Sequence, residues 1–502
     1  MKIVPSREEF KKYAEQGNLI SVYAEVAADM ETPVSAYYKI AKLSSSGPSP
    51  YSFLLESVEG GENIGRYSIL GNAPSLIFSQ EKRKAVLKGR GFEKEIEGKD
   101  VFEKIQNVIS QYKPVTVPGA PPFSGGAVGY ISYDVVSEIE PVVPVPPDSP
   151  LNVPEAFFMI TDGLLVFDRV LHSIKIISNA FIDGDLDIAY DKAVETIMGL
   201  KNLLQTPAQF IPADIDGPGF DVELKSNKTL KEFAEMIEKG KKYIYDGDII
   251  QTVLSQRFSA EIPFHPFAVY RALRMINPSP YMFLLNCGDF SIVGASPEVM
   301  AKCEGDKITV RPIAGTRPRG QTPEKDAELE KELLADPKEC AEHIMLVDLG
   351  RNDIGRVAKP GSVKVEDIMT VERYSHVMHI VSSVTGTLDR SRYGLDSVMR
   401  SAFPAGTLSG APKIRAMQII SELENEKRGP YGGTVASYSF NGNINSCITI
   451  RTAVLKDGIA WFQSGAGIVA DSDPEMEYKE TENKAKAMLR AIASAAYFEV
   501  RQ

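Results

Sequence analysis

The sequence predicts an α+β fold, in which large antiparallel β-sheets pack as a sandwich with helices on the outside. Short apolar segments are joined by Asn-Gly and Asp-Gly turns, for example at residues 441–443 and 456–458. Such turns favour hairpins because these residues accept positive φ, and strands joined by tight hairpins are antiparallel. Segments with helical periodicity stand between the strands. The 502 residues allow two or three domains or one large composite domain.

The second half shows this alternation most clearly. A helix is expected from residue 230, because Leu230, Phe233, Ile237 and Ile244 fall on one face. Residues 249–258 then predict a strand. The other expected strands are 290–299, 307–313, 434–440, 446–455 and 459–463, and the other expected helices are 323–334, 340–349, 414–424 and 475–495.

A stretch rich in Pro, Gly and Asp at residues 205–220 suits an exposed connection. We therefore expect an N-terminal region at 1–215 and a second domain at 216–502.

Composition excludes several classes of function. The net charge is −11, which argues against a general surface for nucleic acid or an anionic membrane. No uncharged apolar run approaches the roughly 18 residues of a membrane helix. The first ten residues are charged and have no apolar segment, so a secretory signal is not expected. A cytoplasmic location is expected. The four cysteines have no metal-ligand spacing, so buried thiols are expected at Cys287, Cys303, Cys340 and Cys447.

Two pairs of carboxylates have the spacing of helix neighbours. Glu339 and Glu342 lie three residues apart on one expected helix, and Glu477 and Glu480 on another. Residues with this spacing share a face, so two converging pairs would offer the oxygen ligands that Mg²⁺ prefers. Solvated helix surface is the alternative interpretation.

Other signals are weak alone. Residues 315–322 have the outline of a phosphate-binding loop, but Gln321 stands where its lysine should be, which argues against a nucleotide. The glycines of Ser464–Gly467 can let an anion approach the backbone or form a plain turn between a strand and the acidic helix. Arg451, in an expected apolar strand, needs an anionic partner, either a ligand or a structural carboxylate. His376 and His379 have helix-like spacing and can be core residues.

Together these segments resemble the chorismate-utilising enzymes, and within them anthranilate synthase component I. The resemblance covers about residues 225–495. It is carried by PIAGTRPRG at 312–320, EHIMLVDLGRND at 342–353, HVMH at 376–379, FPAGTLSGAPK at 403–413, RGPYGG at 428–433, GAGIV at 465–469 and ETENK at 480–484.

The resemblance implies roles for residues at matching positions. Glu298 would be the general acid that protonates the departing C4 hydroxyl of chorismate, and His379 would assist a later step. Glu342 and Glu480 would bind Mg²⁺, with Glu339 and Glu477 holding metal-bound waters. The implied substrate-binding residues are Gly315, Thr316, Tyr431, Arg451, Gly465 and Gly467.

Two positions separate members of the family. Gln251 stands where the relatives that add water have a lysine base, which favours ammonia as the nucleophile. Ala314 stands where aminodeoxychorismate synthases commonly have a lysine nucleophile. Both residues favour anthranilate and pyruvate as products. Aminodeoxychorismate synthase and a catalytically silent tryptophan-binding regulator remain the alternatives.

The resemblance also implies regulation and a partner. FLLES at 53–57, GRYS at 65–68 and NPSPYM at 277–282 resemble the elements that bind inhibitory tryptophan. The expected contacts are Glu56, Ser57, Pro280, Tyr281 and Met282, although Ser437 stands where an aromatic residue is expected. No cysteine lies in the G-x-C-x-G setting of a glutaminase, so a separate glutamine amidotransferase subunit is expected to supply ammonia.

Overall fold

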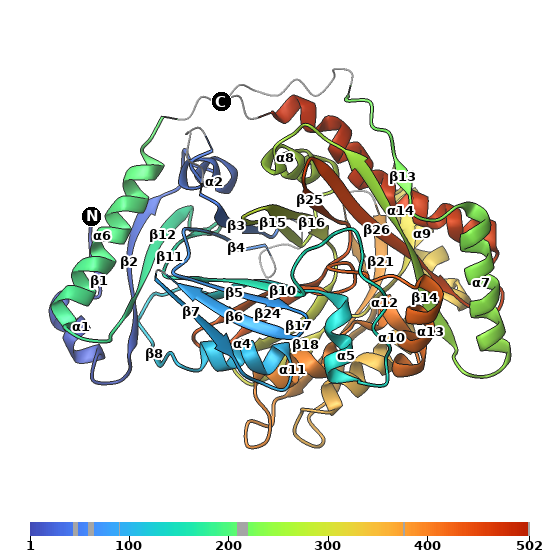
Figure 1. The fold of residues 1–502 in the computed structure, drawn as a ribbon, viewed down its shortest axis with the longest axis horizontal. Coiled ribbons are helices and arrows are strands. Elements are labelled where there is room, and N and C mark those ends of the chain that lie inside the picture. Colours follow the sequence, from blue (N-terminus) through green and yellow to red (C-terminus); the bar gives the residue numbers. More distant parts are fainter. Residues whose placement is uncertain (44–48, 59–64, 90, 208–218, 375–376, 500–502) are drawn as a thin grey trace.

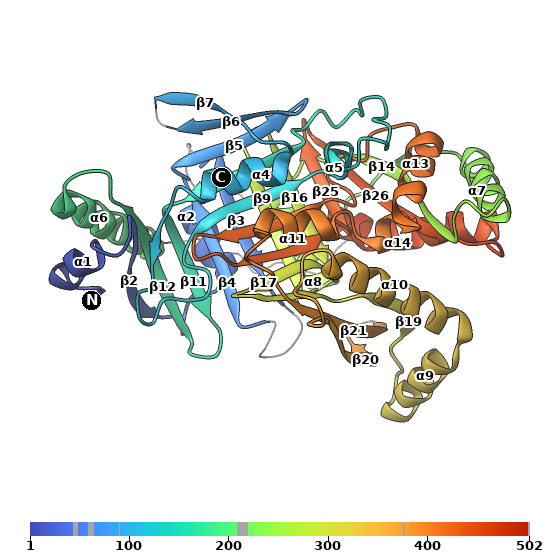
Figure 2. The ribbon, with the colours of Figure 1, turned by 90° about the horizontal axis from the view of Figure 1, so that it is seen from below.

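The computed structural model describes residues 1–43, 49–58, 65–89, 91–207, 219–374 and 377–499. Within these residues, two large sheets form the centre of the molecule and helices lie around them, which confirms the predicted fold class (Figures 1 and 2). The first sheet has 14 strands among the described residues. In spatial order they are β1 (Ile3–Val4), β2 (Leu19–Ala27), β12 (Ser173–Phe181), β11 (Gly163–Asp168), β4 (Tyr67–Asn72), β3 (Tyr51–Glu56), β15 (Tyr281–Cys287), β16 (Phe290–Ser296), β25 (Thr452–Lys456), β26 (Ile459–Ile468), β14 (Gln251–Glu261) and β13 (Lys225–Ser226), with β22 (Gly410–Ala411) beside β14 and β8 (Pro114–Val115) beside β2.

The second sheet has 12 strands within the same ranges. Their order is β19 (Ile313–Pro318), β21 (Val377–Thr387), β18 (Lys307–Val310), β17 (Val299–Glu304), β24 (Ile444–Ile448), β23 (Thr434–Ser439), β9 (Gly126–Ile131), β10 (Ala156–Thr161), β5 (Leu76–Glu81), β6 (Lys84–Gly89) and β7 (Phe92–Ile96), with β20 (Lys364–Arg373) beside β21.

The two sheets share an apolar core. Phe53, Phe283 and Ile292 of the first sheet pack with Tyr130 and Phe157 of the second. Because side chains alternate between the faces of a strand, the outward-facing apolar residues need separate cover. Helices provide it, so the sandwich predicted from the sequence is present.

The helices cover the outer faces and the ends of the sheets. Those of the first half are α1 (Arg7–Tyr13), α2 (Pro33–Ile40), α4 (Val101–Ile109), η1 (Tyr133–Val135), α5 (Val136–Ile139) and α6 (Leu186–Leu204). Those of the second half are α7 (Leu230–Tyr245), α8 (Pro266–Ile276), α9 (Pro323–Ala335), α10 (Pro337–Gly355), α11 (Leu395–Ala402), α12 (Gly406–Ser409), α13 (Lys413–Glu424), α14 (Pro474–Ser494) and η2 (Ala495–Phe498). The five helices expected from the sequence correspond to α7, α9, α10, α13 and α14. The Thr229 side chain caps α7 in a capping box with Glu232.

Strands from both sides of the expected domain boundary share both sheets. Met282 of β15 is paired with Glu56 of β3, and Val435 of β23 with Tyr130 of β9. Residues 208–218, the centre of the expected connection, lie outside the described residues. The regions 1–215 and 216–502 therefore do not form separate sheets, and the composite arrangement allowed by the length is the one observed.

Two expected strands are each divided between the sheets. Residues 290–299 form β16 in the first sheet and the start of β17 in the second, and residues 446–455 contribute to β24 and β25 in the same way. Pro297 lies at the first crossing, and Arg451 adopts a positive φ of 50° at the second. The prediction that Arg451 lies in a strand is therefore wrong.

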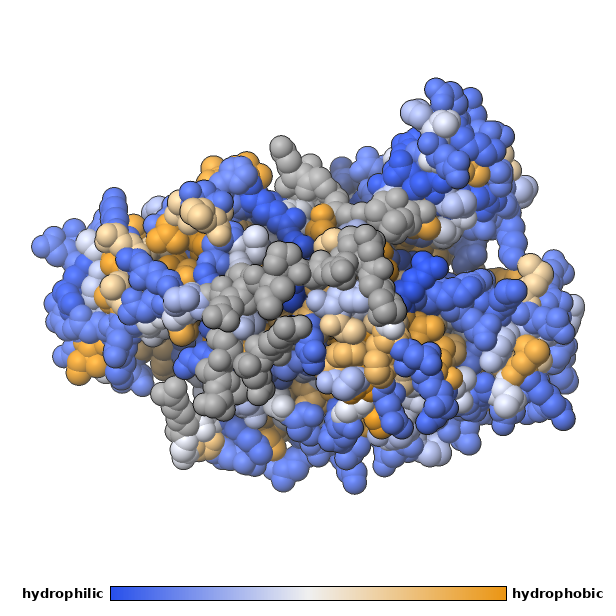
Figure 3. All heavy atoms as spheres, turned by 90° about the horizontal axis from the view of Figure 1, so that it is seen from above, coloured by the Kyte–Doolittle hydropathy of each residue, from blue (hydrophilic) through white to orange (hydrophobic). Residues whose placement is uncertain are grey.

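The surface seen from above is mainly hydrophilic, with separate apolar areas (Figure 3). Among the described helices, none has the length and apolar character needed to cross a membrane.

Candidate active site

The two crossings between the sheets run side by side and place Glu298 near Arg451. The Ile448 N–H donates to the carbonyl of Glu298 at 3.0 Å, and the Ala295 N–H donates to the carbonyl of Arg451 at 3.1 Å. The acidic side chain of Glu298 and the basic side chain of Arg451, which are 153 positions apart in the sequence, thus lie close together where the chain passes between the sheets.

Burial determines the chemistry of Glu298, which is 7% exposed. Desolvation raises the pKa of its carboxyl to about 8, although a hydrogen bond from Thr407 and the charge of Arg451 act in the opposite direction. The Thr407 hydroxyl donates to Oε1 at 3.2 Å. A carboxyl with this pKa is largely protonated at neutral pH and can serve as a general acid.

Arg451 is positioned to bind an anion. Burial lowers the pKa of its guanidinium, and the charge of Glu298 acts in the opposite direction. Among the described residues it has no hydrogen bond or salt bridge to a carboxylate. Because Glu298 is mostly protonated at neutral pH, a carboxylate of a ligand would supply the missing negative charge.

His379 lies on a strand, so the helical spacing suggested by the sequence is wrong. Thr316 of β19 is paired with His379 of β21, while His376 lies outside the described residues. The His379 Nδ1 is 3.0 Å from the carbonyl of Gly315 and 3.1 Å from Oγ1 of Thr316. A carbonyl can only accept, so Nδ1 carries the proton. Burial lowers the pKa of His379 to about 4, which leaves Nε2 free to accept a proton.

Gly465 and Gly467 lie within β26 and not in the predicted turn. They are paired with Ser255 and Val253 of β14. A Cβ added at Gly465 would be 2.9 Å from Oη of Tyr431, and one added at Gly467 would be 2.5 Å from Nε2 of Gln251. The missing side chains thus let Tyr431 and Gln251 lie directly on the strand.

The two glutamate pairs lie on α10 and α14. Burial raises the pKa of Glu339, and so does the charge of Glu342. Burial raises the pKa of Glu477, and so does the charge of Glu480, while a hydrogen bond with Ser472 and the charge of Lys338 on α10 act in the opposite direction. Glu480 forms an ion pair with Lys484 at 2.6 Å.

The pairs are close to other predicted site residues. A Cβ at Gly315 would be 3.2 Å from Oε2 of Glu339, and Lys484 donates to the carbonyl of Gly465 at 3.0 Å. Among the described residues, the four glutamates do not form a ready-made cluster of three or more metal ligands. The donors are nevertheless hard oxygens whose mutual repulsion a divalent cation would relieve.

The residues expected to bind tryptophan meet where β3 pairs with β15. The Glu56 side chain is 0% exposed and forms ion pairs with Arg274 at 2.9 Å and Arg169 at 3.4 Å. Tyr270 also donates to it. Tyr281 donates to the side chain of Asn445 at 3.0 Å. Ser57, Pro280 and Met282 are buried beside them, and Ser437 donates to the carbonyl of Asn445.

Comparisons with known proteins agree with this arrangement. Residues 76–490 match the family described as chorismate binding enzyme. The anthranilate synthase component 1 of Acetivibrio thermocellus is 49% identical over 498 residues, which cover 98% of this chain and 99% of that protein. The chain belongs to the chorismate binding enzyme family.

Solved structures support the same assignment. Anthranilate synthase component I from Streptococcus pneumoniae TIGR4 matches with a TM-score of 0.77 and 36% identity, covering 92% of this chain and 98% of that one. The menaquinone-specific isochorismate synthase from Escherichia coli has a TM-score of 0.71 at 16% identity, which shows a shared fold.

The sequence did not single out every residue around Glu298 in this chorismate binding enzyme. Thr407 lies within the recognised FPAGTLSGAPK segment, but only the structure shows its hydrogen bond to Glu298. A cavity beside Glu298 is also lined by Asp353, whose buried carboxylate pairs with Lys413 at 2.8 Å. Both partners belong to recognised segments, and their side-chain contact depends on how α10 and α13 meet.

Proposed function

We propose that this chain is the large subunit of an anthranilate synthase, which converts chorismate and ammonia into anthranilate, pyruvate and water in tryptophan biosynthesis. The observation that carries the proposal is the proximity of a buried Glu298, with a pKa of about 8, and a partly buried Arg451 without a carboxylate salt bridge among the described residues. An acid and an anion site meet there. The relatives named anthranilate synthase component 1 support the choice of reaction.

In the proposed reaction, the enolpyruvyl carboxylate is bound by the side chains of Arg451 and Tyr431 and by the backbone at Gly465 and Gly467. Protonated Glu298 donates its proton to the C4 hydroxyl, which leaves as water while ammonia forms the C–N bond at C2. Neutral His379, with Nδ1 donating to Gly315, assists the later elimination of pyruvate.

Gln251 and Ala314 support ammonia as the nucleophile and C2 as the site of attack. Gln251 lies beside Gly467, and its amide cannot deprotonate water as a lysine base could. Ala314 of β19 is paired with Ile380 of β21, and its methyl group cannot form a covalent intermediate.

Magnesium is part of the proposal. Glu342 and Glu480 would bind it directly, with Glu339 and Glu477 holding its waters. Bound there, Mg²⁺ supplies positive charge for the ring carboxylate of chorismate.

Inhibition by tryptophan is proposed at the site formed by Glu56 and the residues around it, where β3 pairs with β15. The buried Nδ2 of Asn277 has no hydrogen-bond partner among the described residues and can donate to a ligand carboxylate. Glu56 would bind the ligand ammonium, in competition with its present contacts to Arg274 and Arg169.

A separate glutamine amidotransferase subunit is proposed as the source of ammonia. Burial raises the pKa of the thiols of Cys287, Cys303 and Cys447, which makes them poor nucleophiles at neutral pH. Cys340 lacks the sequence setting of a glutaminase nucleophile.

The test is an assay of the purified chain with chorismate and Mg²⁺. Ammonium is expected to support formation of fluorescent anthranilate, and chelation to abolish it. Glutamine alone is expected to give none, because none of the four cysteines has the sequence setting of a glutaminase nucleophile. Turnover with glutamine alone would contradict the proposal that a separate amidotransferase subunit is needed. No turnover with ammonium would contradict the proposed activity.

A further inference from the structure

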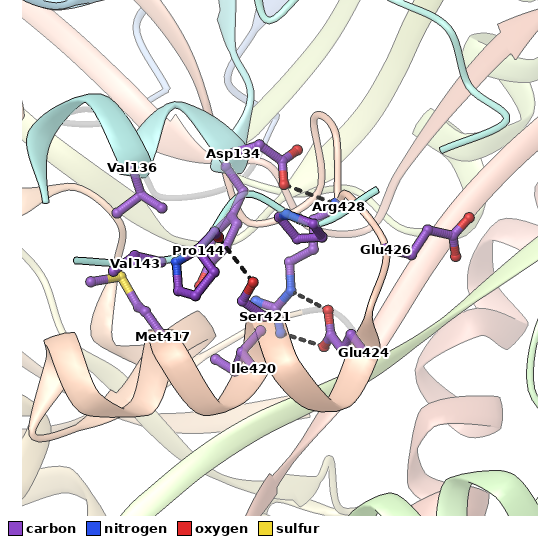
Figure 4. Close-up of a pocket in the computed structure, with 12 residues that line it drawn as sticks. Asp134, Val136, Val143, Pro144, Met417, Ile420, Ser421, Glu424, Glu426 and Arg428 are labelled. Carbon is purple, nitrogen blue, oxygen red and sulfur yellow. Dashed lines mark hydrogen bonds and ion pairs between the residues drawn. The ribbon is translucent and has the colours of Figure 1, made fainter. Parts of the chain in front are cut away.

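Arg428 lies at a junction between the segments that carry the candidate site. Its side chain is 1% exposed, and its guanidinium lies 4.6 Å from the ring centre of Tyr133 and 5.6 Å from that of Tyr431. Figure 4 shows it between Glu424 and the segment that carries Asp134. A charged group that contacts two buried rings helps to fix the position of both.

The guanidinium also binds two backbone carbonyls from separate elements. Nη1 donates to Leu408 at 2.7 Å, and Nη2 donates to Val253 at 2.8 Å. Leu408 follows Thr407, which binds Glu298, and Val253 is paired with Gly467. One side chain therefore connects Tyr431, the Thr407 segment and the strand behind Gly467.

Glu424 and Asp134 hold Arg428 from two sides. Glu424 accepts from Nε at 2.8 Å and from Nη2 at 2.6 Å, and it also accepts the backbone N–H of Ser255 at 2.8 Å. The Asp134 carboxylate accepts the backbone N–H groups of Arg428 at 3.1 Å and Gly429 at 2.7 Å. A buried ion pair often contributes no more to stability than apolar groups of the same shape. Stability alone therefore does not account for the buried pair of Arg428 and Glu424.

We propose that Arg428, held by Glu424, is a positioning residue for the reaction, which sets Thr407 against Glu298 and Tyr431 against Gly465. The inference rests on the proposed function. The rigid, planar guanidinium of Arg428 reaches several acceptors in fixed directions. The single ammonium group of a lysine cannot reproduce this arrangement.

The experiment is Arg428→Lys, measured as the pH profile of kcat/KM for chorismate. The expected value falls by between about tenfold and about a hundredfold, since misplacement of about 1 Å costs on that scale. The alkaline limb moves to higher pH, because the hydrogen bond from Thr407 lowers the pKa of Glu298 and is weakened. In a Thr407→Val background, Arg428→Lys is expected to shift the limb no further.

Arg400→Lys is the matched control. Arg400 is a partly buried arginine that forms ion pairs with Asp100 and Asp396. The Arg400→Lys variant is expected to have a lower melting temperature, but the alkaline limb of its kcat/KM profile should not move. Glu424→Gln, which keeps the shape of the side chain, serves as a second variant if Arg428→Lys does not fold.

The inference is overturned if Arg428→Lys loses stability like the control but keeps kcat/KM and the alkaline limb. A shift that persists in full in the Thr407→Val background also overturns it. A wild-type chain that makes no anthranilate refutes the proposed function instead, so the two failures are distinguishable.

Discussion

At the scale of single residues, the central feature is a carboxyl whose burial keeps it protonated. For Glu298→Gln we expect kcat to fall by about 10²- to 10⁴-fold, which is the usual contribution of a general acid. In the wild type, kcat/KM should decline as pH rises through about 8, because the acid is lost. A steady-state profile measures this, and a wild-type profile that stays flat to pH well above 8 would contradict the assignment.

The same pKa has a consequence for stability. Folding raises the pKa of Glu298 from 4.5 to about 8, so the folded state binds a proton that the unfolded state releases between these values. The free energy of unfolding therefore falls as pH rises through this window, by about 3 kcal/mol at neutral pH. The Glu298→Gln variant has no titrating carboxyl at this position, so its free energy of unfolding does not show this decrease. Thermal melts from pH 5 to 8 should show the variant gaining stability relative to the wild type.

Glu480 offers a test of metal binding. Glu480→Gln is expected to raise the Mg²⁺ concentration for half-maximal activity by at least about tenfold, because a neutral amide is a poor ligand for this cation. Glu482→Gln, on the exposed surface of the same helix, should leave the titration unchanged. An Mg²⁺ titration measures both, and identical curves would argue against a role for Glu480 in metal binding.

At the scale of elements, periodicity predicted helices better than it predicted where strands end. Apolar residues predominate in the segments 290–299 and 446–455, and most residues of both segments are buried. Pattern alone could not show that the chain changes sheets at Pro297 or at the positive φ of Arg451. The residue types at the site were therefore predictable from motifs, but the contact of Thr407 with Glu298 was not, because it depends on tertiary packing.

The glycines of β26 give a test at this scale. Gly465→Ala would place a Cβ 2.8 Å from the carbonyl of Leu254 and 2.9 Å from Oη of Tyr431. The strand or Tyr431 must move, so we expect KM for chorismate to rise by about tenfold or more. Gly199→Ala in α6, whose Cβ would meet no atom within 4 Å, is the control. Steady-state kinetics measure both, and an unchanged KM at position 465 would place the substrate elsewhere.

At the scale of the whole molecule, the two regions expected from the linker are interleaved. A boundary at residues 205–220 follows from local composition, but the pairing of β3 with β15 and of β9 with β23 joins segments more than 200 residues apart. Such long-range pairing leaves no signal in a local window. It does place Glu56 of the first half against Arg274 of the second.

This contact makes Glu56 the test of regulation. Glu56→Gln is expected to raise the tryptophan concentration for half-inhibition by at least about tenfold while sparing ammonia-dependent activity, since a charged hydrogen bond contributes about 1.5–3 kcal/mol. Gln is chosen because it keeps the shape of the side chain, so that Arg274 and Arg169 do not face a cavity. Glu25→Gln, on a partly exposed carboxylate, is the control. Inhibition curves measure the effect, and unchanged inhibition would place the tryptophan site elsewhere.

The proposed reaction is tested by identifying the product that the purified chain forms from chorismate and isotopically labelled ammonium in the presence of Mg²⁺. Nuclear magnetic resonance and mass spectrometry locate the labelled nitrogen. We expect an aromatic product with nitrogen on the ring carbon next to the carboxylate, together with one equivalent of pyruvate. Nitrogen on the carbon opposite the carboxylate, with the enolpyruvyl group retained, would contradict it.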